Sequence, residues 1–405
     1  MKIYISGISG TGMGPLALMA KAAGFEVLGS DLSRGAVYDE LIRAGIPVFI
    51  GEQDGEFLQE NFEGLDWFVY TSALPEDHAE LVLAREAGVK CTKRDELTAF
   101  LISELGLKMI AVAGTHGKTT TTAMIVYAAL KLGLPVSYIV GTTLGFAPSG
   151  SFKEGDKYFV YEADEYDRNF LKFSPFLSVI TTVSYDHPDI YATREDYIEA
   201  FNQFMAQSEK VVREPEIPAE EFKLAGAVRR EDAALAFSAI SEMAPEIPAQ
   251  QIIEALNEFP GVGRRFERIA DGIYSDYAHH PEEIQATMDV AFDEAELKGL
   301  RGVVVVYQPH QNTRQHEVRE GYMDAFIGAE RIFWLPTYLT REDPDLTILS
   351  AAELIDGLYN AEVAEAAELN DELFEEILKY REAGYLVLLM TAGPADGWLR
   401  EKLSK

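Results

Sequence analysis

The chain has 405 residues, with 35 Lys and Arg against 67 Asp and Glu, and its formal net charge at pH 7 is −32. This charge disfavours binding to nucleic acid or to an anionic membrane surface, because both repel the chain. No apolar run approaches the roughly eighteen residues of a membrane span, and no basic and apolar leader opens the sequence. The length predicts two or three domains, and the single cysteine, Cys91, excludes an internal disulfide.

A glycine-rich turn lies near the start of the chain. Residues 2–6 predict a strand, residues 14–23 a helix, and residues 26–30 a second strand that ends at Asp31. Between the first strand and the helix lie Gly7, Ser9, Gly10, Thr11, Gly12 and Met13. The alternation predicts a parallel, doubly wound sheet, and the glycines let a phosphate approach the helix N-terminus. The spacing is G-x-x-G-x-G rather than G-x-G-x-x-G, so a dinucleotide site with Asp31 on the ribose is the weaker interpretation.

The most informative stretch follows a domain boundary that we place near residue 107. An apolar run at residues 109–113 predicts a strand, and the residues after Lys118 have helical spacing. The loop between them is Gly114, Thr115, His116, Gly117, Lys118, Thr119 and Thr120. Such a loop turns backbone N–H groups toward an anion, while Lys118 adds charge and Thr119 can reach Mg²⁺. Two residues separate the glycines where a Walker A loop has four, yet the pattern favours a nucleotide triphosphate over a turn without ligand.

Two further strands deliver polar residues to the same edge of the predicted sheet. A strand at residues 158–161 runs into four carboxylates within residues 162–167, and a strand at residues 176–183 precedes His187. Because the carboxyl ends of parallel strands line the ligand crevice, we expect this acidic cluster to face the phosphate loop. Carboxylates this close repel one another, so a cation or solvent has to stabilise them. A metal site is the favoured interpretation, with an exposed acidic loop and a structural histidine as alternatives.

The last part of the chain repeats the alternation of strands and helices. Predicted strands cover residues 272–275, 302–307, 331–335 and 385–390, and predicted helices cover residues 282–295, 317–326 and 395–403. Arg264 and Arg265 precede them beside glycines, and plain surface charge is one interpretation of this pair. Adjacent His279 and His280 suggest zinc in isolation, but no third ligand follows at a suitable spacing, so we expect no zinc there.

Six motifs occur in an order that resembles the Mur ligases, which build the peptide of bacterial peptidoglycan: GISGTGMG, AGTHGKTTT, EADEYD, DHPD, GRRF and DYAHHP. The resemblance spans nearly the whole chain. It implies an α/β fold of three domains. They are a Rossmann-like domain for the uridine nucleotide at residues 1–107, a shortened P-loop ATPase-like domain at residues 108–261, and a Rossmann-like domain for the amine substrate at residues 262–405.

The resemblance also implies roles for individual residues. The expected catalytic residues are Lys118, Glu162, His187 and Arg264, and the expected Mg²⁺ ligands are Thr119, Glu162 and His187. The expected ATP contacts are Gly114, Thr115, His116, Gly117, Lys118, Thr119, Thr120, Arg264, Asp276 and His279. The expected contacts to the uridine nucleotide are Gly7, Ser9, Gly10, Thr11, Gly12, Met13, Ser30, Asp31, Ser72 and Ala73. The expected amine contacts are His280, His310 and Arg314.

One region departs from the family pattern. Where the family helix opens with G-x-H-N-x-x-N, this chain has Val228, Arg229 and Asp232 in place of His, Asn and Asn. A short charged link at residues 211–223 replaces several strands, so we expect a smaller central domain. The resemblance therefore does not assign the contacts to ATP from this helix.

The resemblance implies an ATP- and Mg²⁺-dependent ligase that adds L-alanine or a related amino acid or peptide to the carboxylate of UDP-N-acetylmuramate, through an acyl phosphate. A ligase that reloads recycled tripeptide is a near alternative, slightly favoured by residues 165–167. Two more distant possibilities are a catalytically weak nucleotide-binding protein and a dehydrogenase. We expect a cytoplasmic monomer or homodimer with no nucleic-acid or membrane partner.

Overall fold

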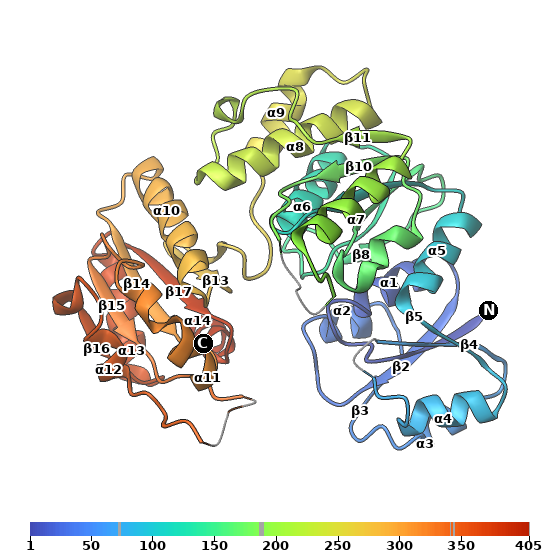
Figure 1. Cartoon of the computed structure of the whole chain (residues 1–405), viewed down its shortest axis with the longest axis horizontal. Helices are drawn as coiled ribbons and strands as arrows, with labels where there is room; N and C mark the ends of the chain where they lie inside the picture. Colours follow the sequence, from blue (N-terminus) through green and yellow to red (C-terminus); the bar gives the residue numbers. More distant parts are fainter. Residues whose placement is uncertain (72–73, 186–189, 341, 343–344, 405) are drawn as a thin grey trace. The chain divides into compact units, whose positions relative to one another are not determined.

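The computed structural model describes residues 1–404 with the exception of 72–73, 186–189, 341 and 343–344. The chain forms two compact units: unit 1 comprises Met1–Lys223 and Glu231–Phe259, and unit 2 comprises Leu224–Arg230 and Pro260–Lys405. Among the described residues, unit 1 contains two sheets and unit 2 contains one, each flanked by helices (Figure 1). The predicted α/β fold with mostly parallel strands is therefore confirmed. The domain limits at residues 107 and 261 stay a prediction.

The N-terminal sheet is parallel, with the strand order β3-β2-β1-β4-β5. Its elements are β1 Lys2–Ser6, α1 Gly14–Ala22, β2 Glu26–Asp31, α2 Tyr38–Arg43, β3 Val48–Ile50, α3 Glu56–Glu60, β4 Leu65–Tyr70, α4 Ala79–Glu86, β5 Lys90–Lys93 and α5 Arg94–Glu104. Successive side chains of a strand point to opposite faces. Ile3 and Ile5 therefore pack with α1 and α5, whereas Tyr4 packs with α3 and α4. The strand order reverses between β1 and β4, which places a ligand crevice at their carboxyl ends.

The central sheet has the order β11-β10-β6-β9-β7-β8, and β8 is antiparallel to β7. Its elements are β6 Lys108–Ala113, α6 Lys118–Lys131, β7 Val136–Ile139, β8 Gly150–Ser151, β9 Tyr158–Glu162, a 3-10 segment Tyr166–Lys172, β10 Leu177–Ile180, α7 Arg194–Ala206, β11 Lys210–Val212, a 3-10 turn Ala219–Glu221, α8 Ala227–Met243 and α9 Ala249–Asn257. Helix α1 contacts β7 and β8. One apolar core runs from Ile3 and Ile5 to Met109 and Phe159, which explains why both sheets belong to one compact unit.

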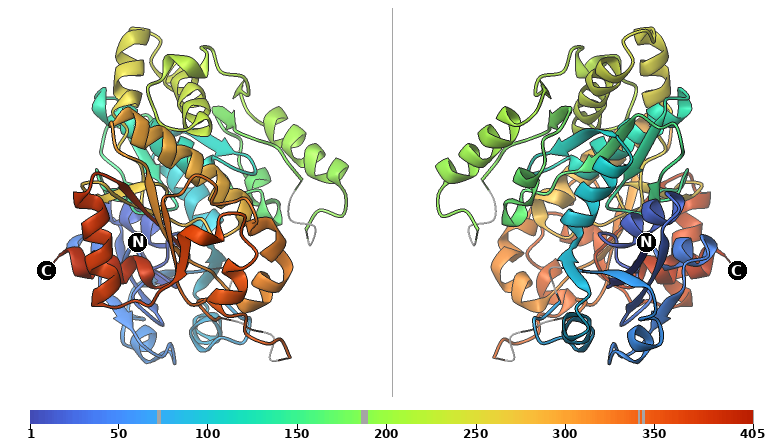
Figure 2. Two further views of the ribbon diagram at one scale, coloured as in Figure 1. Left: turned by 90° about the vertical axis from the view of Figure 1, so that its left-hand side faces the viewer. Right: turned by 90° about the vertical axis from the view of Figure 1, so that its right-hand side faces the viewer.

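The sheet of unit 2 has the order β12-β13-β17-β14-β15-β16, with β12 antiparallel at one edge. Its elements are β12 Glu267–Ala270, β13 Ile273–Asp276, α10 Pro281–Leu297, β14 Val303–Gln308, α11 Asn312–Val318, a 3-10 turn Arg319–Tyr322, β15 Arg331–Trp334, α12 Ala351–Ile355, a 3-10 turn Ala361–Val363, β16 Ala364–Ala366, α13 Asp371–Glu382, β17 Leu386–Thr391 and α14 Ala395–Leu403. Val303 and Val305 face α10, whereas Val304 and Val306 face α13 and α14. The long helix α10 thus covers one face of this sheet (Figures 1 and 2).

Two predicted elements differ from the structure. The strand predicted at residues 176–183 ends at Ile180, because Thr181 and Thr182 bond to the loop after β6 instead of continuing the ladder. The helix predicted at residues 317–326 begins at Asn312 and ends at Val318. The side chain of Asn312 donates to Thr347 O at 3.1 Å and accepts from Leu349 N at 2.9 Å, which anchors the helix at this earlier position. Within the described residues, no helix has the length and apolar composition that a membrane span requires.

Candidate active site

Three segments meet at the carboxyl edge of the central sheet. Strand β6 lies between β9 and β10, so the loop that follows β6 is flanked by the segments that follow its two neighbours. These segments are the phosphate loop at residues 114–117, the acidic cluster at residues 162–167, and the polar residues that follow β10. The expected approach of the acidic cluster to the phosphate loop is observed in the contacts below.

Two glycines are required by the shape of the phosphate loop. Gly114 has a φ of +148° and Gly117 a φ of +82°, which L side chains rarely adopt. A Cβ at Gly114 would lie 2.1 Å from Thr181 Oγ1, and a Cβ at Gly117 would lie 2.6 Å from Asp232 Oδ1. A side chain at either position would therefore push the loop away from the segment after β10 or from α8.

The first amides of the loop hold its own conformation. Thr115 N donates to Thr182 O at 2.6 Å, and His116 N donates to Thr182 Oγ1 at 3.1 Å. Helix α6 starts at Lys118, and no described side chain caps its first turn. Because the first amides of a helix lack intrahelical acceptors, the donors that remain for a phosphate are those of residues 118–120.

Lys118 and Thr119 each contact a carboxylate of the acidic cluster. Lys118 Nζ donates to both carboxylate oxygens of Glu165, at 3.0 and 2.8 Å, and Glu165 is only 1% exposed. Thr119 Oγ1 donates to Glu162 Oε1 at 2.8 Å. A buried carboxylate requires a partner, so the pair with Glu165 keeps the ammonium of Lys118 at the loop.

The pair of Thr119 and Glu162 fits a Mg²⁺ ion. Mg²⁺ usually takes one or two protein oxygens and completes its shell with water and phosphate oxygens. No cluster of three or more His, Cys, Asp or Glu side chains able to hold a metal occurs among the described residues. The third expected ligand, His187, lies outside the described residues, as do Ser72 and Ala73.

Helix α8, which lacks the expected family motif, still contacts the phosphate loop. Asp232 is 6% exposed, and its Oδ1 accepts a hydrogen bond from Thr121 Oγ1 on α6 at 3.0 Å. Val228 is exposed, and the Arg229 guanidinium lies 5.9 Å from the ring centroid of Phe266. Of the three replaced positions, Asp232 therefore keeps a contact with the helix of the phosphate loop.

Ser9 and Asp31 shape the glycine turn after β1. Asp31 Oδ2 accepts from Ser9 N at 3.0 Å and from Ser9 Oγ at 2.7 Å, while Gly35 N donates to Ser9 Oγ at 2.9 Å. Ser30 is fully buried, and its hydroxyl donates to Glu80 Oε2 at 2.8 Å. The Ser30 hydroxyl is therefore engaged in a buried hydrogen bond. A contact from Ser30 to the nucleotide stays a prediction.

Glu80 is a buried carboxylate beneath this turn, with 1% of its surface exposed. It accepts from Tyr4 OH at 2.6 Å, from Ser6 Oγ at 2.7 Å and from Gln53 Nε2 at 3.2 Å, in addition to Ser30. Burial, followed by the charge of Glu80, raises the pKa of Tyr4 well above its usual range. The network ties β1, β2 and α4 together below the glycine turn.

A cleft of about 470 Å³ opens at the glycine turn. Six of the expected nucleotide contacts line it: Gly7, Gly10, Thr11, Gly12, Met13 and Asp31. Asp164, Tyr166 and Asn169 of the central domain also line the cleft, beside Arg94 of α5. The acidic cluster therefore divides: Glu162 and Glu165 face the phosphate loop, whereas Asp164 belongs to the cleft.

In unit 2, Arg264 and Asp276 shape the segment before the third sheet. Arg264 has a φ of +55°, its Nη2 donates to Thr391 O, and its guanidinium lies 4.6 Å from the ring centroid of Tyr277. Asp276 Oδ2 accepts from Phe266 N at 2.6 Å, and burial raises the pKa of Asp276. Both side chains thus stabilise unit 2 itself, and their contacts to ATP stay predictions.

A polar group of unit 2 brings together His279, His310 and Arg314. The two histidine rings are 5.5 Å apart, and burial lowers the pKa of both, with Arg314 contributing to each shift. His310 Nδ1 and Arg314 Nη1 are buried with no hydrogen-bond partner among the described residues. His280 opens α10, and its amide donates to Glu283 Oε2 at 3.1 Å. The buried N–H of Arg314 without a described partner favours an anionic ligand at this group.

Comparison with known proteins decides the family. Residues 2–104 match the model described as Mur ligase family, catalytic domain, and residues 112–213 match the Mur ligase middle domain. The UDP-N-acetylmuramate–L-alanine ligase of Fusobacterium nucleatum is 31% identical, over 91% of this chain and 90% of its own. The chain belongs to the Mur ligase family.

Other relatives agree with this assignment. The UDP-N-acetylmuramate–L-alanine ligase of Kineococcus radiotolerans is 32% identical, over 86% of this Mur ligase and 84% of its own chain. The alignment with the Fusobacterium protein has 437 positions, more than the 405 residues here, so that relative contains residues that this chain lacks. The shortened central domain stays a prediction.

Solved structures show the same fold over the whole chain. The UDP-N-acetylmuramate–alanine ligase of Thermotoga maritima has a TM-score of 0.78 at 24% identity and covers 100% of this Mur ligase and 98% of its own chain. A murein peptide ligase of Psychrobacter arcticus has a TM-score of 0.60 at 22% identity, with the same coverage.

Three contact residues of this Mur ligase were not predicted from its sequence: Glu165 as the partner of Lys118, Asp232 as the partner of Thr121, and Arg94 in the cleft. The scarcity of Lys and Arg in this acidic chain was a usable signal for Arg94. Glu165 and Asp232 had no such signal, because their partners are 47 and 111 residues away.

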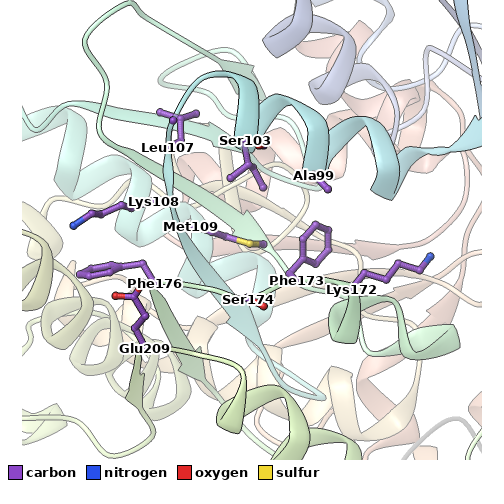
Figure 3. Close-up of a pocket in the computed structure, with 12 residues that line it drawn as sticks. Ala99, Ser103, Leu107, Lys108, Met109, Lys172, Phe173, Ser174, Phe176 and Glu209 are labelled. Atoms are coloured by element: carbon purple, nitrogen blue, oxygen red, sulfur yellow. The ribbon is translucent and has the colours of Figure 1, made fainter.

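A second pocket, of about 340 Å³, lies at the amino-terminal end of strand β6 in the central sheet (Figure 3). Lys108 and Met109 at the start of β6 line it, together with Ala99 and Ser103 of α5 and Phe173. The phosphate loop follows the far end of this six-residue strand, about 20 Å away at the usual rise of a strand. This pocket is therefore separate from the candidate active site.

Proposed function

We propose that this Mur ligase joins the carboxylate of UDP-N-acetylmuramate to the amine of L-alanine, with conversion of ATP to ADP and phosphate, in peptidoglycan precursor synthesis. The observation that carries the proposal is the contact of Thr119 with Glu162 beside Lys118, because it combines an anion site with a carboxylate for a metal. The names of relatives that are 31% and 32% identical over most of the chain support the choice of substrates.

The proposed reaction has two steps. The carboxylate oxygen attacks the γ-phosphorus and ADP leaves, which gives an acyl phosphate. The amine then attacks the acyl carbon, phosphate leaves, and the nitrogen loses a proton to give the amide. In the first step, Lys118 and the amides of residues 118–120 hold the phosphates and stabilise charge on the moving group. Mg²⁺ held by Thr119 and Glu162 would neutralise charge between the phosphates.

Unit 2 carries the proposed contacts for the amine substrate. Arg314 Nη1 and His310 Nδ1 are buried donors or acceptors without a described partner. The lowered pKa of His310 keeps its ring neutral at pH 7, so Arg314 supplies the positive charge of this group. A guanidinium binds a carboxylate through parallel hydrogen bonds, so the carboxylate of an amino acid fits this position. His280 is a further proposed contact to the amine substrate. The proposed contacts to ATP include Arg264, Asp276 and His279.

Phosphate release from Mg-ATP tests the function. The assay contains UDP-N-acetylmuramate and, in parallel, L-alanine, other amino acids or a short peptide of the recycled tripeptide type. We expect release that requires both the nucleotide sugar and L-alanine. Release only with the tripeptide would replace this function by that of a recycling ligase, and nucleotide binding without turnover would favour a catalytically weak binding protein. A melting temperature that NAD raises and a uridine nucleotide does not would support a dehydrogenase instead.

A further inference from the structure

Arg94 is a cation at the boundary between the glycine turn and the acidic cluster. It opens α5 and lines the cleft of about 470 Å³. A Cβ at Gly12 would lie 2.8 Å from Arg94 Nη1, so the guanidinium lies directly against the glycine turn. The side chain is 30% exposed, which leaves part of the guanidinium open to the cleft.

Carboxylates from both domains hold Arg94 in this place. Arg94 Nη2 lies 3.4 Å from Asp164 Oδ2 of the central domain, and Arg94 Nε lies 3.5 Å from Asp95 Oδ1. Asp95 is in turn paired with Lys172 at 3.2 Å. The acidic segment that carries Asp164 continues through two residues with positive φ, Asp167 at +53° and Arg168 at +55°. Such backbone strain persists only where surrounding structure maintains it, often near functional sites.

The other acidic group of the cleft is engaged in the turn itself. Asp31 Oδ2 accepts two hydrogen bonds from Ser9, so it stabilises the turn. Arg94 and Lys93 are the cations among the described residues that line the cleft, and Lys93 lies 3.9 Å from Asp167 Oδ2. A planar guanidinium with several parallel donors suits phosphate and carboxylate oxygens better than a single ammonium does.

We propose that Arg94 binds the anionic oxygens of the nucleotide sugar in this cleft, and that Asp164 of the central domain is the positioning residue that holds Arg94 against the glycine turn. This inference rests on the proposed function and adds a residue that fixes the sugar nucleotide. It also means that the nucleotide-sugar site is completed by the central domain rather than by the N-terminal domain alone.

Calorimetric titration with UDP-N-acetylmuramate in the absence of ATP tests the proposal on the full chain. We expect Arg94→Ala to raise the Kd about tenfold to a hundredfold, the range of a lost hydrogen bond to a charged group, with the KM for ATP unchanged. Arg94→Lys keeps the charge and should recover part of the affinity. Asp164→Asn should weaken binding less than Arg94→Ala. The matched control is Arg85→Ala, because Arg85 belongs to the same domain but pairs with exposed Glu76 outside the cleft.

The identity of the anionic group follows from a second ligand. UDP-N-acetylglucosamine has the diphosphate but lacks the carboxylate that the ligase would modify. If Arg94 contacts the diphosphate, Arg94→Ala weakens both ligands equally; if it contacts the carboxylate, only binding of UDP-N-acetylmuramate weakens.

Wild-type protein that neither binds UDP-N-acetylmuramate nor turns over would overturn the proposed function itself. Wild-type protein that binds it while Arg94→Ala binds within twofold of wild type would overturn only the role of Arg94. Should Arg94→Ala melt at a much lower temperature, Arg94→Gln decides, since it keeps most of the side chain and removes the charge. Arg94→Gln with wild-type affinity contradicts the proposal, and weaker sugar-nucleotide binding with an unchanged KM for ATP supports it.

Discussion

Two glycine turns of unit 1 have the same backbone design and different charges. Each follows a central strand of a parallel sheet, β1 or β6, and each leads into a helix. The turn after β6 is followed at once by Lys118 and Thr119, which contact Glu165 and Glu162. The turn after β1 has no lysine, and its adjacent cation, Arg94, comes from the start of α5.

The difference shows how the same kind of glycine turn can bind two kinds of anion. A helix N-terminus offers amides to any phosphate, and the side chains around it decide which phosphate is bound. A hydroxyl and a carboxylate beside a lysine suit a triphosphate with its metal, whereas a guanidinium without a metal pair suits a smaller anionic group. Each turn also lies on a buried carboxylate, Asp232 at the phosphate loop and Glu80 at the first turn.

Lys118→Ala should give the largest effect, because it removes the cation that distinguishes the phosphate loop from the turn after β1. The lost charge should raise the barrier by several kcal/mol, so ADP formation should fall by about a thousandfold or more. Steady-state ADP release measures it, and Lys131→Ala at the other end of α6 is the control. Binding of UDP-N-acetylmuramate at the first turn should stay unchanged. Ordinary turnover of Lys118→Ala would defeat the assignment of the phosphate loop.

Glu162→Gln tests whether Glu162 binds Mg²⁺ at the phosphate loop. The neutral amide keeps the shape but binds Mg²⁺ poorly, so turnover should fall about a hundredfold and should recover in part at high Mg²⁺. A titration of rate against Mg²⁺ concentration gives the result. An unchanged Mg²⁺ dependence would show that Glu162 is not a metal ligand, and Glu26→Gln, an exposed site in the first sheet, is the control.

Glu80→Gln tests the support beneath the first turn. One acceptor oxygen is lost among four donors, so the free energy of unfolding should decrease by about 1–3 kcal/mol. Thermal or denaturant unfolding provides the measurement, and the control Glu76→Gln, which is exposed, should be nearly neutral. A stability equal to wild type would mean that the buried network contributes little.

Asp232→Asn should have the smallest effect and tests the buried carboxylate beside the phosphate loop. Asn retains the acceptor for Thr121 and removes a negative charge near the phosphate loop, so ATP should bind about threefold to tenfold more tightly. Equilibrium titration with ATP measures the change, and Asp232→Ala, which loses the acceptor, separates charge from hydrogen bonding. Weaker ATP binding by Asp232→Asn would show that the carboxylate itself is needed.

The order of strands and helices was accessible from the sequence because apolar periodicity and glycine turns are local signals. The strands β1, β6, β9 and β17 lie within one or two residues of their predicted limits. The helix α11 was misplaced because its start depends on Asn312, whose partners Thr347 and Leu349 are more than thirty residues away.

Sequence alone was sufficient to predict the α/β fold, the phosphate loop and the acidic cluster, since each depends on residues that are neighbours in the chain. The division of the cluster depends instead on tertiary contacts, which pair Glu165 with Lys118, Glu162 with Thr119 and Asp164 with Arg94. Charges select partners by distance in space, and those distances are set by sheet order and by the core that the first two domains share.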